Sequence, residues 1–76
     1  MDNSNLFNLI STRLQAMGYV VRQSPSSPNC WYASKSEFEY LFALVRENDQ
    51  WRVNDISGRG TLEQPRIERE LNDSCN

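Results

Sequence analysis

The sequence predicts an α+β fold, in which an N-terminal helix is followed by an antiparallel β-meander of three to four strands and a short C-terminal helix. Two observations support this order. Apolar residues recur at helical spacing near both ends of the chain. Between them, short stretches rich in β-branched and aromatic residues alternate with turn-forming residues. Because 76 residues suffice for one domain at most, we expect a single unit over residues 1–76.

The first element is a helix predicted over residues 4–17. Asn3 or Ser4 can cap its start by accepting a hydrogen bond from a free backbone N–H, and Gly18 can end it in the left-handed conformation. Steps of three and four residues place its apolar side chains on one stripe, made of Leu6, Leu9, Ile10, Leu14 and Met17.

Four strands are predicted over residues 19–23, 30–34, 37–46 and 51–56. The segment "SPSSPN" separates the first two, because prolines and serines cannot sustain a ladder of backbone hydrogen bonds. The segments "SKSE" and "ENDQ" provide the two later turns. Sequential strands joined by such short connections predict an antiparallel meander.

The C-terminal helix is predicted over residues 62–72. Thr61 and Gln64 have the spacing of a capping box, and Pro65 is tolerated in a first helical turn. Leu62, Ile67 and Leu71 are expected to face inward. Residues 73–76 are expected to form a flexible tail.

The two faces of the sheet follow from the turns. A two-residue turn at Asn48-Asp49 sets Leu44 opposite Val53, and one at Lys35-Ser36 sets Ala33 opposite Phe38. The core face then carries Trp31, Ala33, Phe38, Tyr40, Phe42, Leu44, Trp51 and Val53. The second face carries Cys30, Tyr32, Glu39, Leu41, Ala43, Val45, Arg52, Asn54 and Ile56. A three-residue turn at Asn48-Asp49 would shift the register by one residue and move the side chains of the last strand to the opposite faces of the sheet.

The second face raises the question of what covers it, since both faces of the longest strand are apolar. The C-terminal helix, another molecule, or solvent can occupy this face. That helix offers only three apolar side chains and can equally pack beside the first helix, which favours an interaction surface. The candidate interface consists of Tyr32, Leu41, Val45, Arg52 and Ile56.

This surface predicts a small, non-enzymatic protein-interaction module. Its partner would be another protein or a second copy of the chain, and its role would be that of a regulator or inhibitor. A chain this small gains only about 3–5 kcal/mol from its core, so support from a partner is physically reasonable. The expected location is the cytoplasm, because no segment has the length and hydropathy of a signal peptide or membrane span.

An alternative is binding of nucleic acid or phosphate by arginines and an exposed aromatic. Gly58 and Gly60 flank Arg59 just before a helix start, and Arg66 and Arg69 lie one helical turn apart. The net charge of −2 disfavours nucleic acid. Plain turn chemistry explains the glycines, and acidic residues alternate with the two helical arginines as on a solvated helix.

Catalysis, metals and cofactors find no support in the residue types. The chain has no histidine, so the usual general base near neutral pH is absent and a zinc site lacks ligands. Its two cysteines, Cys30 and Cys75, do not predict a disulfide, since the second lies in the expected tail. We therefore expect no enzymatic activity, no metal and no cofactor.

The predicted order of elements resembles that of double-stranded RNA-binding domains. In those domains the second helix starts with lysines and continues with alanines, and it grips phosphate. The corresponding segment here is "LEQPRIEREL", which contains neither residue type. The order of elements therefore does not extend to the RNA-binding function.

Overall fold

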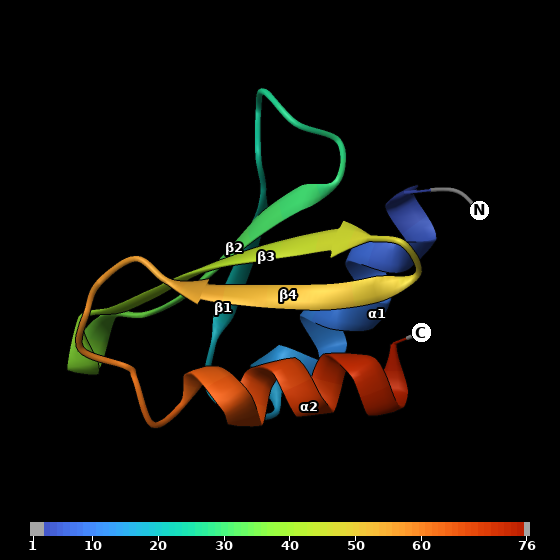
Figure 1. Ribbon diagram of the computed structural model, residues 1–76. Coiled ribbons are helices and arrows are strands. Elements are labelled where there is room, and N and C mark those ends of the chain that lie inside the picture. The colour runs from blue at the N-terminus through green and yellow to red at the C-terminus, as the bar shows by residue number, and fades with distance from the viewer. Residues whose placement is uncertain (1–2, 76) are drawn as a thin grey trace.

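The computed structural model describes residues 3–75 and confirms the α+β fold. Four strands form one antiparallel sheet in the order β1-β2-β3-β4, between an N-terminal and a C-terminal helix (Figure 1). The elements are α1 (Asn3–Gln15), β1 (Val20–Gln23), β2 (Cys30–Lys35), a 3₁₀ turn (Ser36–Phe38), β3 (Tyr40–Glu47), β4 (Gln50–Asp55) and α2 (Gln64–Ser74).

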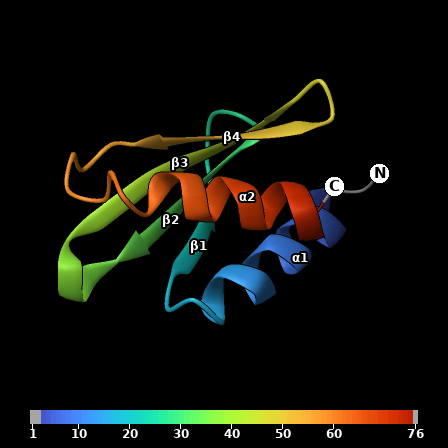
Figure 2. The same cartoon turned by 60° about the horizontal axis from the view of Figure 1, so that its bottom comes forward.

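Both helices lie on the same side of the sheet. Figures 1 and 2 show α1 and α2 side by side beneath the strands, with α1 nearer β1 and α2 nearer β4. Burial follows this arrangement, since alternate residues of each strand are buried and their neighbours are not. The sheet therefore has one covered face and one face without a helix.

The core lies between the helices and the covered face. Trp31 and Trp51 are both buried within it, as their assignment to the core face predicts, and their ring centroids are 5.3 Å apart. Ring contacts of this kind add about 0.5–1.5 kcal/mol beyond the burial of apolar area. The other buried apolar residues are Leu6, Ile10, Leu14, Tyr19, Val21, Ala33, Phe42, Leu44, Val53, Ile67, Leu71 and Cys75.

The turn between β3 and β4 confirms the predicted register. Asn48 and Asp49 have φ angles of 53° and 60°, the left-handed pair of a type I′ hairpin turn. Asn and Asp adopt this conformation more readily than other residues that carry a Cβ. Leu44 consequently pairs with Val53, so both side chains point into the core.

The turn between β2 and β3 differs from the prediction of a two-residue turn at Lys35-Ser36. Residues Ser36–Phe38 form a 3₁₀ turn, and Glu39 follows in the left-handed region with φ of 57°. As a result Ala33 pairs with Phe42 rather than with Phe38. The displacement is an even number of residues, so β3 keeps its faces, but Phe38 is 53% exposed instead of buried.

Helix α1 matches its prediction except in two side chains. Leu6, Ile10 and Leu14 are buried, as expected from their spacing. Leu9 is 41% exposed, and Met17 lies beyond the helix, packed against the edge of the core. The side chains of Asn3 and Ser4, the expected caps, lie outside the described part of the molecule.

Helix α2 is shifted towards the C-terminus relative to its prediction. It begins at Gln64 after Glu63, so the expected cap at Thr61 is wrong, and Leu62 is 87% exposed rather than inward-facing. Pro65 does occupy the first turn, and Ile67 and Leu71 are buried, as expected.

The C-terminal tail was expected to fray from residue 73, but the helix continues through Ser74 and Cys75 is buried. The Cys75 carbonyl accepts a hydrogen bond from the indole N–H of Trp51 at 3.2 Å, which ties the end of the chain to β4. Asn76 lies outside the described residues.

Polar side chains of α2 close the free edge of β4. The backbone N–H groups of Trp51, Val53 and Asp55 point away from β3, because alternate residues of an edge strand do so. They donate to Asn72 Oδ1 (2.9 Å), Glu68 Oε1 (2.9 Å) and Gln64 Oε1 (3.2 Å), respectively. The three acceptors are four residues apart, so they lie on one face of the helix.

Candidate functional site

Within residues 3–75, the sheet face opposite the helices carries apolar side chains that no helix covers. Burial of Val21, Ala33, Phe42 and Val53 on the helix side requires their strand neighbours to point the other way. We call this surface the open face. It is formed by Val20, Arg22, Cys30, Tyr32, Ser34, Leu41, Ala43, Val45, Arg52, Asn54 and Ile56.

All five residues of the predicted interface come together on the open face. Tyr32, Leu41 and Val45 are half-buried by their neighbours in the sheet, Arg52 is exposed, and Ile56 is 52% exposed. Ile56 follows β4 and donates its backbone N–H to the Leu41 carbonyl at 2.8 Å, which keeps it beside β3.

The part of the open face contributed by β1 was not predicted from the sequence. Val20 is 55% exposed there, and Arg22 is exposed beside it. The alternation of buried Tyr19 and Val21 with these two residues is the pattern that would have placed them. Cross-strand pairing sets Val20 beside Ser34, and Ser34 beside Leu41, so the open face extends across all four strands, with the polar Ser34 between Val20 and Leu41.

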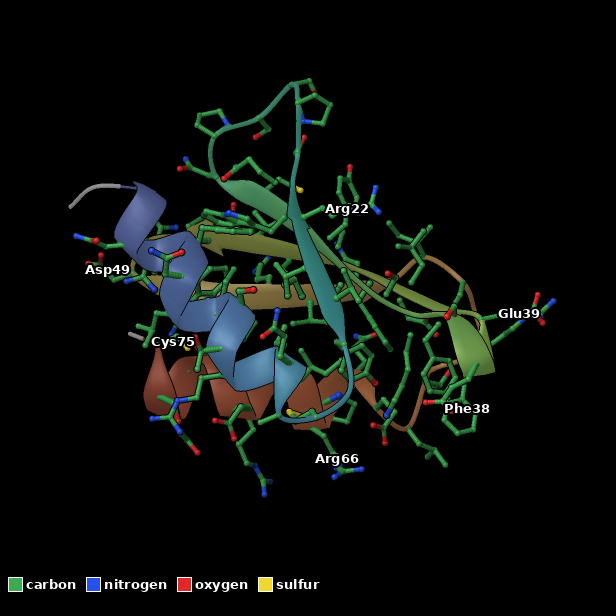
Figure 3. The ribbon with its side chains drawn as sticks, turned by 180° about the vertical axis from the view of Figure 1, so that it is seen from behind. Arg22, Phe38, Glu39, Asp49, Arg66 and Cys75 are labelled. Carbon is green, nitrogen blue, oxygen red and sulfur yellow. The ribbon has the colours of Figure 1, made fainter. Side chains whose placement is uncertain are left out.

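Ion pairs lie at both ends of β3. At its start the Glu39 carboxylate pairs with the Arg59 guanidinium, and at its end Glu47 Oε1 lies 3.3 Å from Arg52 Nε. Figure 3 shows Glu39 and Asp49 at opposite ends of the sheet. Asp49 is in the turn that begins directly after Glu47, so it marks the end of β3. Exposed pairs of this kind contribute roughly 0–1 kcal/mol to stability, so their interest lies in the charge pattern that they present.

The glycine loop after β4 is organised around an internal carboxylate. Asp55 accepts the Ser57 hydroxyl at 2.7 Å, and the backbone N–H groups of Gly60 at 2.9 Å and Gly58 at 3.1 Å. These hydrogen bonds, that of Ser57 first, lower the pKa of Asp55. The N–H groups that an external anion would require from Gly58 and Gly60 are therefore engaged by the chain itself.

Gly60 has a second role in packing. A Cβ atom at this position would lie 2.3 Å from Phe42 Cζ, so only a residue without a side chain lets the loop approach the buried ring. Gly58 has a φ of 72° and open space around it, so it serves the turn conformation instead. The glycines of this segment thus have structural explanations.

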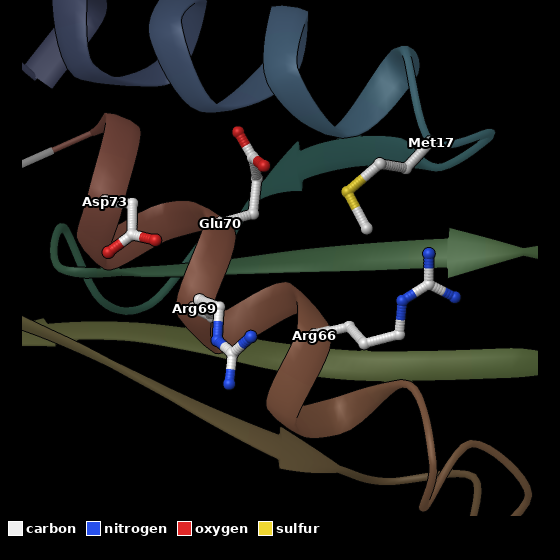
Figure 4. Close-up of a pocket in the computed structure, with 5 residues that line it drawn as sticks. All are labelled: Met17, Arg66, Arg69, Glu70 and Asp73. Carbon is white, nitrogen blue, oxygen red and sulfur yellow. The ribbon is translucent and has the colours of Figure 1, made fainter.

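The three arginines of the phosphate-binding alternative do not form one cluster with free charges. Arg59 pairs with Glu39, and Arg66 Nη1 of α2 lies 2.8 Å from Oε2 of Glu63, the residue that precedes this helix. Figure 4 shows Arg66 and Arg69 beside a shallow hollow that Met17, Glu70 and Asp73 also line. Two cations and two carboxylates border this hollow, so it presents no net charge to an anion.

Chemistry-bearing groups are sparse in the described chain. Residues 3–75 contain no group of three or more His, Cys, Asp or Glu side chains placed to hold a metal ion. Cys30 and Cys75 are both free thiols, and burial raises the pKa of the Cys75 thiol. No helix in the described range has the length and apolar character needed to cross a membrane.

Comparison of the chain with protein families, with curated proteins and with solved structures finds no match.

Proposed function

We propose that the protein is a small non-enzymatic interaction module that binds a protein partner through the open face. The observation that supports this most strongly is the placement of α2 beside α1 on the same side of the sheet. Within residues 3–75, no helix covers Val20, Leu41, Val45 or Ile56 on the other side.

An uncovered sheet face of this kind suits a docking surface. Monomeric proteins seldom expose contiguous apolar patches above a few hundred Å² without a binding role. Burial of such surface contributes roughly 25 cal/mol per Å² before the costs of association are subtracted. Tyr32 adds an aromatic ring with a polar tip, the type of side chain enriched among residues that dominate binding energy.

The closed edge of β4 argues for docking on the face rather than by strand addition at that edge. A partner strand would need the N–H groups of Trp51, Val53 and Asp55, which α2 side chains already satisfy. It would have to displace three hydrogen bonds before forming its own. The face requires no such exchange.

A regulator or inhibitor that acts in the cytoplasm by binding its target fits the small size of the chain, and the sequence has no histidine to serve as a general base near neutral pH. Binding of nucleic acid or phosphate has less support, because Arg59 and Arg66 are paired with carboxylates and the net charge is −2. We expect no measurable binding of nucleic acid at physiological salt in a fluorescence-anisotropy titration. Salt-sensitive micromolar binding would favour the alternative.

The direct test compares three forms of the protein immobilised on a resin: the parent, Val45→Glu and Gln15→Glu. The two variants add the same charge, one on the open face and one on an exposed position of α1. Partner proteins from the native cells should be retained by the parent and by Gln15→Glu, and lost from Val45→Glu. Equal retention by all three forms would place the binding surface elsewhere.

A further inference from the structure

An ion pair lies at each end of the ribbon formed by β3 and β4. Residues face each other across it in successive levels: Glu39 with Arg59, Leu41 with Ile56, Ala43 with Asn54, and Val45 with Arg52, whose guanidinium reaches Glu47. At both ends the carboxylate comes from the β3 side and the guanidinium from the β4 side. The apolar pair and the small Ala43 lie between the two ends.

We propose that the partner bound by the open face is a second copy of this chain, related by a two-fold axis that runs between β3 and β4 and parallel to them. This inference rests on the proposed function, because it names the partner that docks on the same face; the contact uses the β3–β4 half of that face and leaves Val20 of β1 and Tyr32 of β2 outside it. The contact is isologous, so each copy uses the same patch. It packs two sheets face to face with their strands nearly aligned.

Electrostatic complementarity favours this axis. The two-fold operation places the β3 side of one copy over the β4 side of the other, so Glu39 meets Arg59 of the second copy and Glu47 meets Arg52 of the second copy. Each ion pair thus faces the equivalent pair of the second copy, with carboxylate opposite guanidinium. Every carboxylate then lies near two arginines, one from each copy. Complementary charges at the rim fix the register of an interface and exclude competing arrangements.

A two-fold axis across the strands gives the opposite result. It would place β3 over β3, bringing Glu39 towards Glu47 of the second copy and Arg59 towards Arg52. Like charges would then meet at both ends, which is unfavourable. The axis along the strands also sets Leu41 against Ile56 of the second copy, and the small Ala43 opposite Asn54 lets the two ribbons approach.

The size of the ribbon sets the expected strength. β3 spans Tyr40–Glu47, eight residues, which corresponds to about 26 Å at the rise of a strand. A two-stranded surface of this length is smaller than the roughly 800 Å² per partner of a standard stable interface. We therefore expect a reversible dimer with a dissociation constant on the order of 100 µM.

The test is sedimentation equilibrium of the full chain from about 10 µM to about 1 mM, which brackets that constant. The parent should dimerise, and Glu47→Arg should weaken the dimer at least about fivefold, because like charges then meet across the axis. The double variant Glu47→Arg/Arg52→Glu should dimerise again, since exchanging both charges restores the complementary pattern. Thermal melts of each variant report any loss of folding separately.

Mixing distinguishes this contact from the ion pair within one copy. In a dimer of one parent chain and one double variant, Glu47 would meet a glutamate and Arg52 an arginine, so mixed dimers should form below the statistical proportion. Mixed dimers at the statistical proportion would overturn the proposed axis. A parent that stays monomeric at 1 mM would exclude a second copy as the partner, while the retention test with Val45→Glu would still decide whether the open face binds another protein.

Discussion

The Glu68 carboxylate accepts the backbone N–H of Val53 at 2.9 Å, so a helix side chain takes the place of a fifth strand. Gln64 and Asn72 do the same for Asp55 and Trp51, at one-turn intervals on either side. This row of acceptors fixes α2 beside β4 on the covered side of the sheet. The open face is therefore a consequence of polar contacts as much as of apolar packing.

The first prediction tests this row. Glu68→Ala should lower the free energy of unfolding by about 1–3 kcal/mol, because the Val53 N–H loses its acceptor in a part-buried place. Glu68→Gln keeps an acceptor oxygen and should cost less. Arg69→Ala, the exposed neighbour, should change stability by less than about 0.5 kcal/mol in urea unfolding. Equal effects of Glu68→Ala and Arg69→Ala would show that the contact contributes nothing.

The second prediction contrasts two phenylalanines. Phe42 is fully buried, and truncation to alanine should cost about 3–5 kcal/mol, which is most of the stability of a chain this small. Phe42→Ala should therefore be largely unfolded at room temperature by circular dichroism. Phe38→Ala removes the same atoms from a side chain that is 53% exposed, and its cooperative melt should remain. A Phe42→Ala melt close to that of the parent would contradict the core assignment.

The third prediction concerns the approach of Gly60 to Phe42. Gly60→Ala should destabilise the fold by about 1–3 kcal/mol, because the new methyl group overlaps the ring. Gly58→Ala meets no atom and should cost about 1 kcal/mol from its left-handed backbone alone. In a Phe42→Leu background the cost of Gly60→Ala should fall, as a double-mutant cycle would measure. An unchanged cost would exclude the ring as its cause.

The fourth prediction is a pH effect centred on Tyr19. Burial, together with the charge of Glu63 and the hydrogen bond to it, raises the pKa of Tyr19 from 10.0 to about 12. The folded state therefore favours the neutral phenol, and this contribution is present below pH 10 and lost as the pH rises towards 12. Between pH 10 and 12 the melting temperature of the parent should fall more steeply with pH than that of Tyr19→Phe. Parallel curves would show that Tyr19 titrates normally.

The register of the sheet could be predicted where the residue types of a turn indicate its position and length. Asn48 and Asp49 tolerate the left-handed conformation that a two-residue hairpin demands, so Leu44 and Val53 fell on the core face as predicted. The β2–β3 turn was not predictable in this way, because its left-handed residue is Glu39, a type that gives no such signal. Phe38 was consequently assigned to the core although it lies in the turn.

The side of the sheet on which α2 packs could not be predicted from the spacing of its apolar residues. Only Ile67 and Leu71 of this helix and the adjoining Cys75 are buried apolar residues, and Leu62 points away from the core. The contacts that seat the helix come from Gln64, Glu68 and Asn72, which in the sequence look like a solvated polar face. Most residues of the open face were predicted, but Val20, Arg22 and Ser34 were not, and the exposure of the face depended on which side of the sheet α2 would take.

The most direct test of the central claim compares Val45→Glu with Val53→Glu by thermal melting. These valines lie in adjacent strands on opposite faces of the sheet, so each variant introduces the same charge on one face. Val45→Glu should keep a cooperative melt, because the carboxylate remains in contact with water on the open face. Val53→Glu should be unfolded, since an unpaired charge in the core costs several kcal/mol. If Val45→Glu unfolds the protein as Val53→Glu does, the second face is part of the core and the docking surface does not exist.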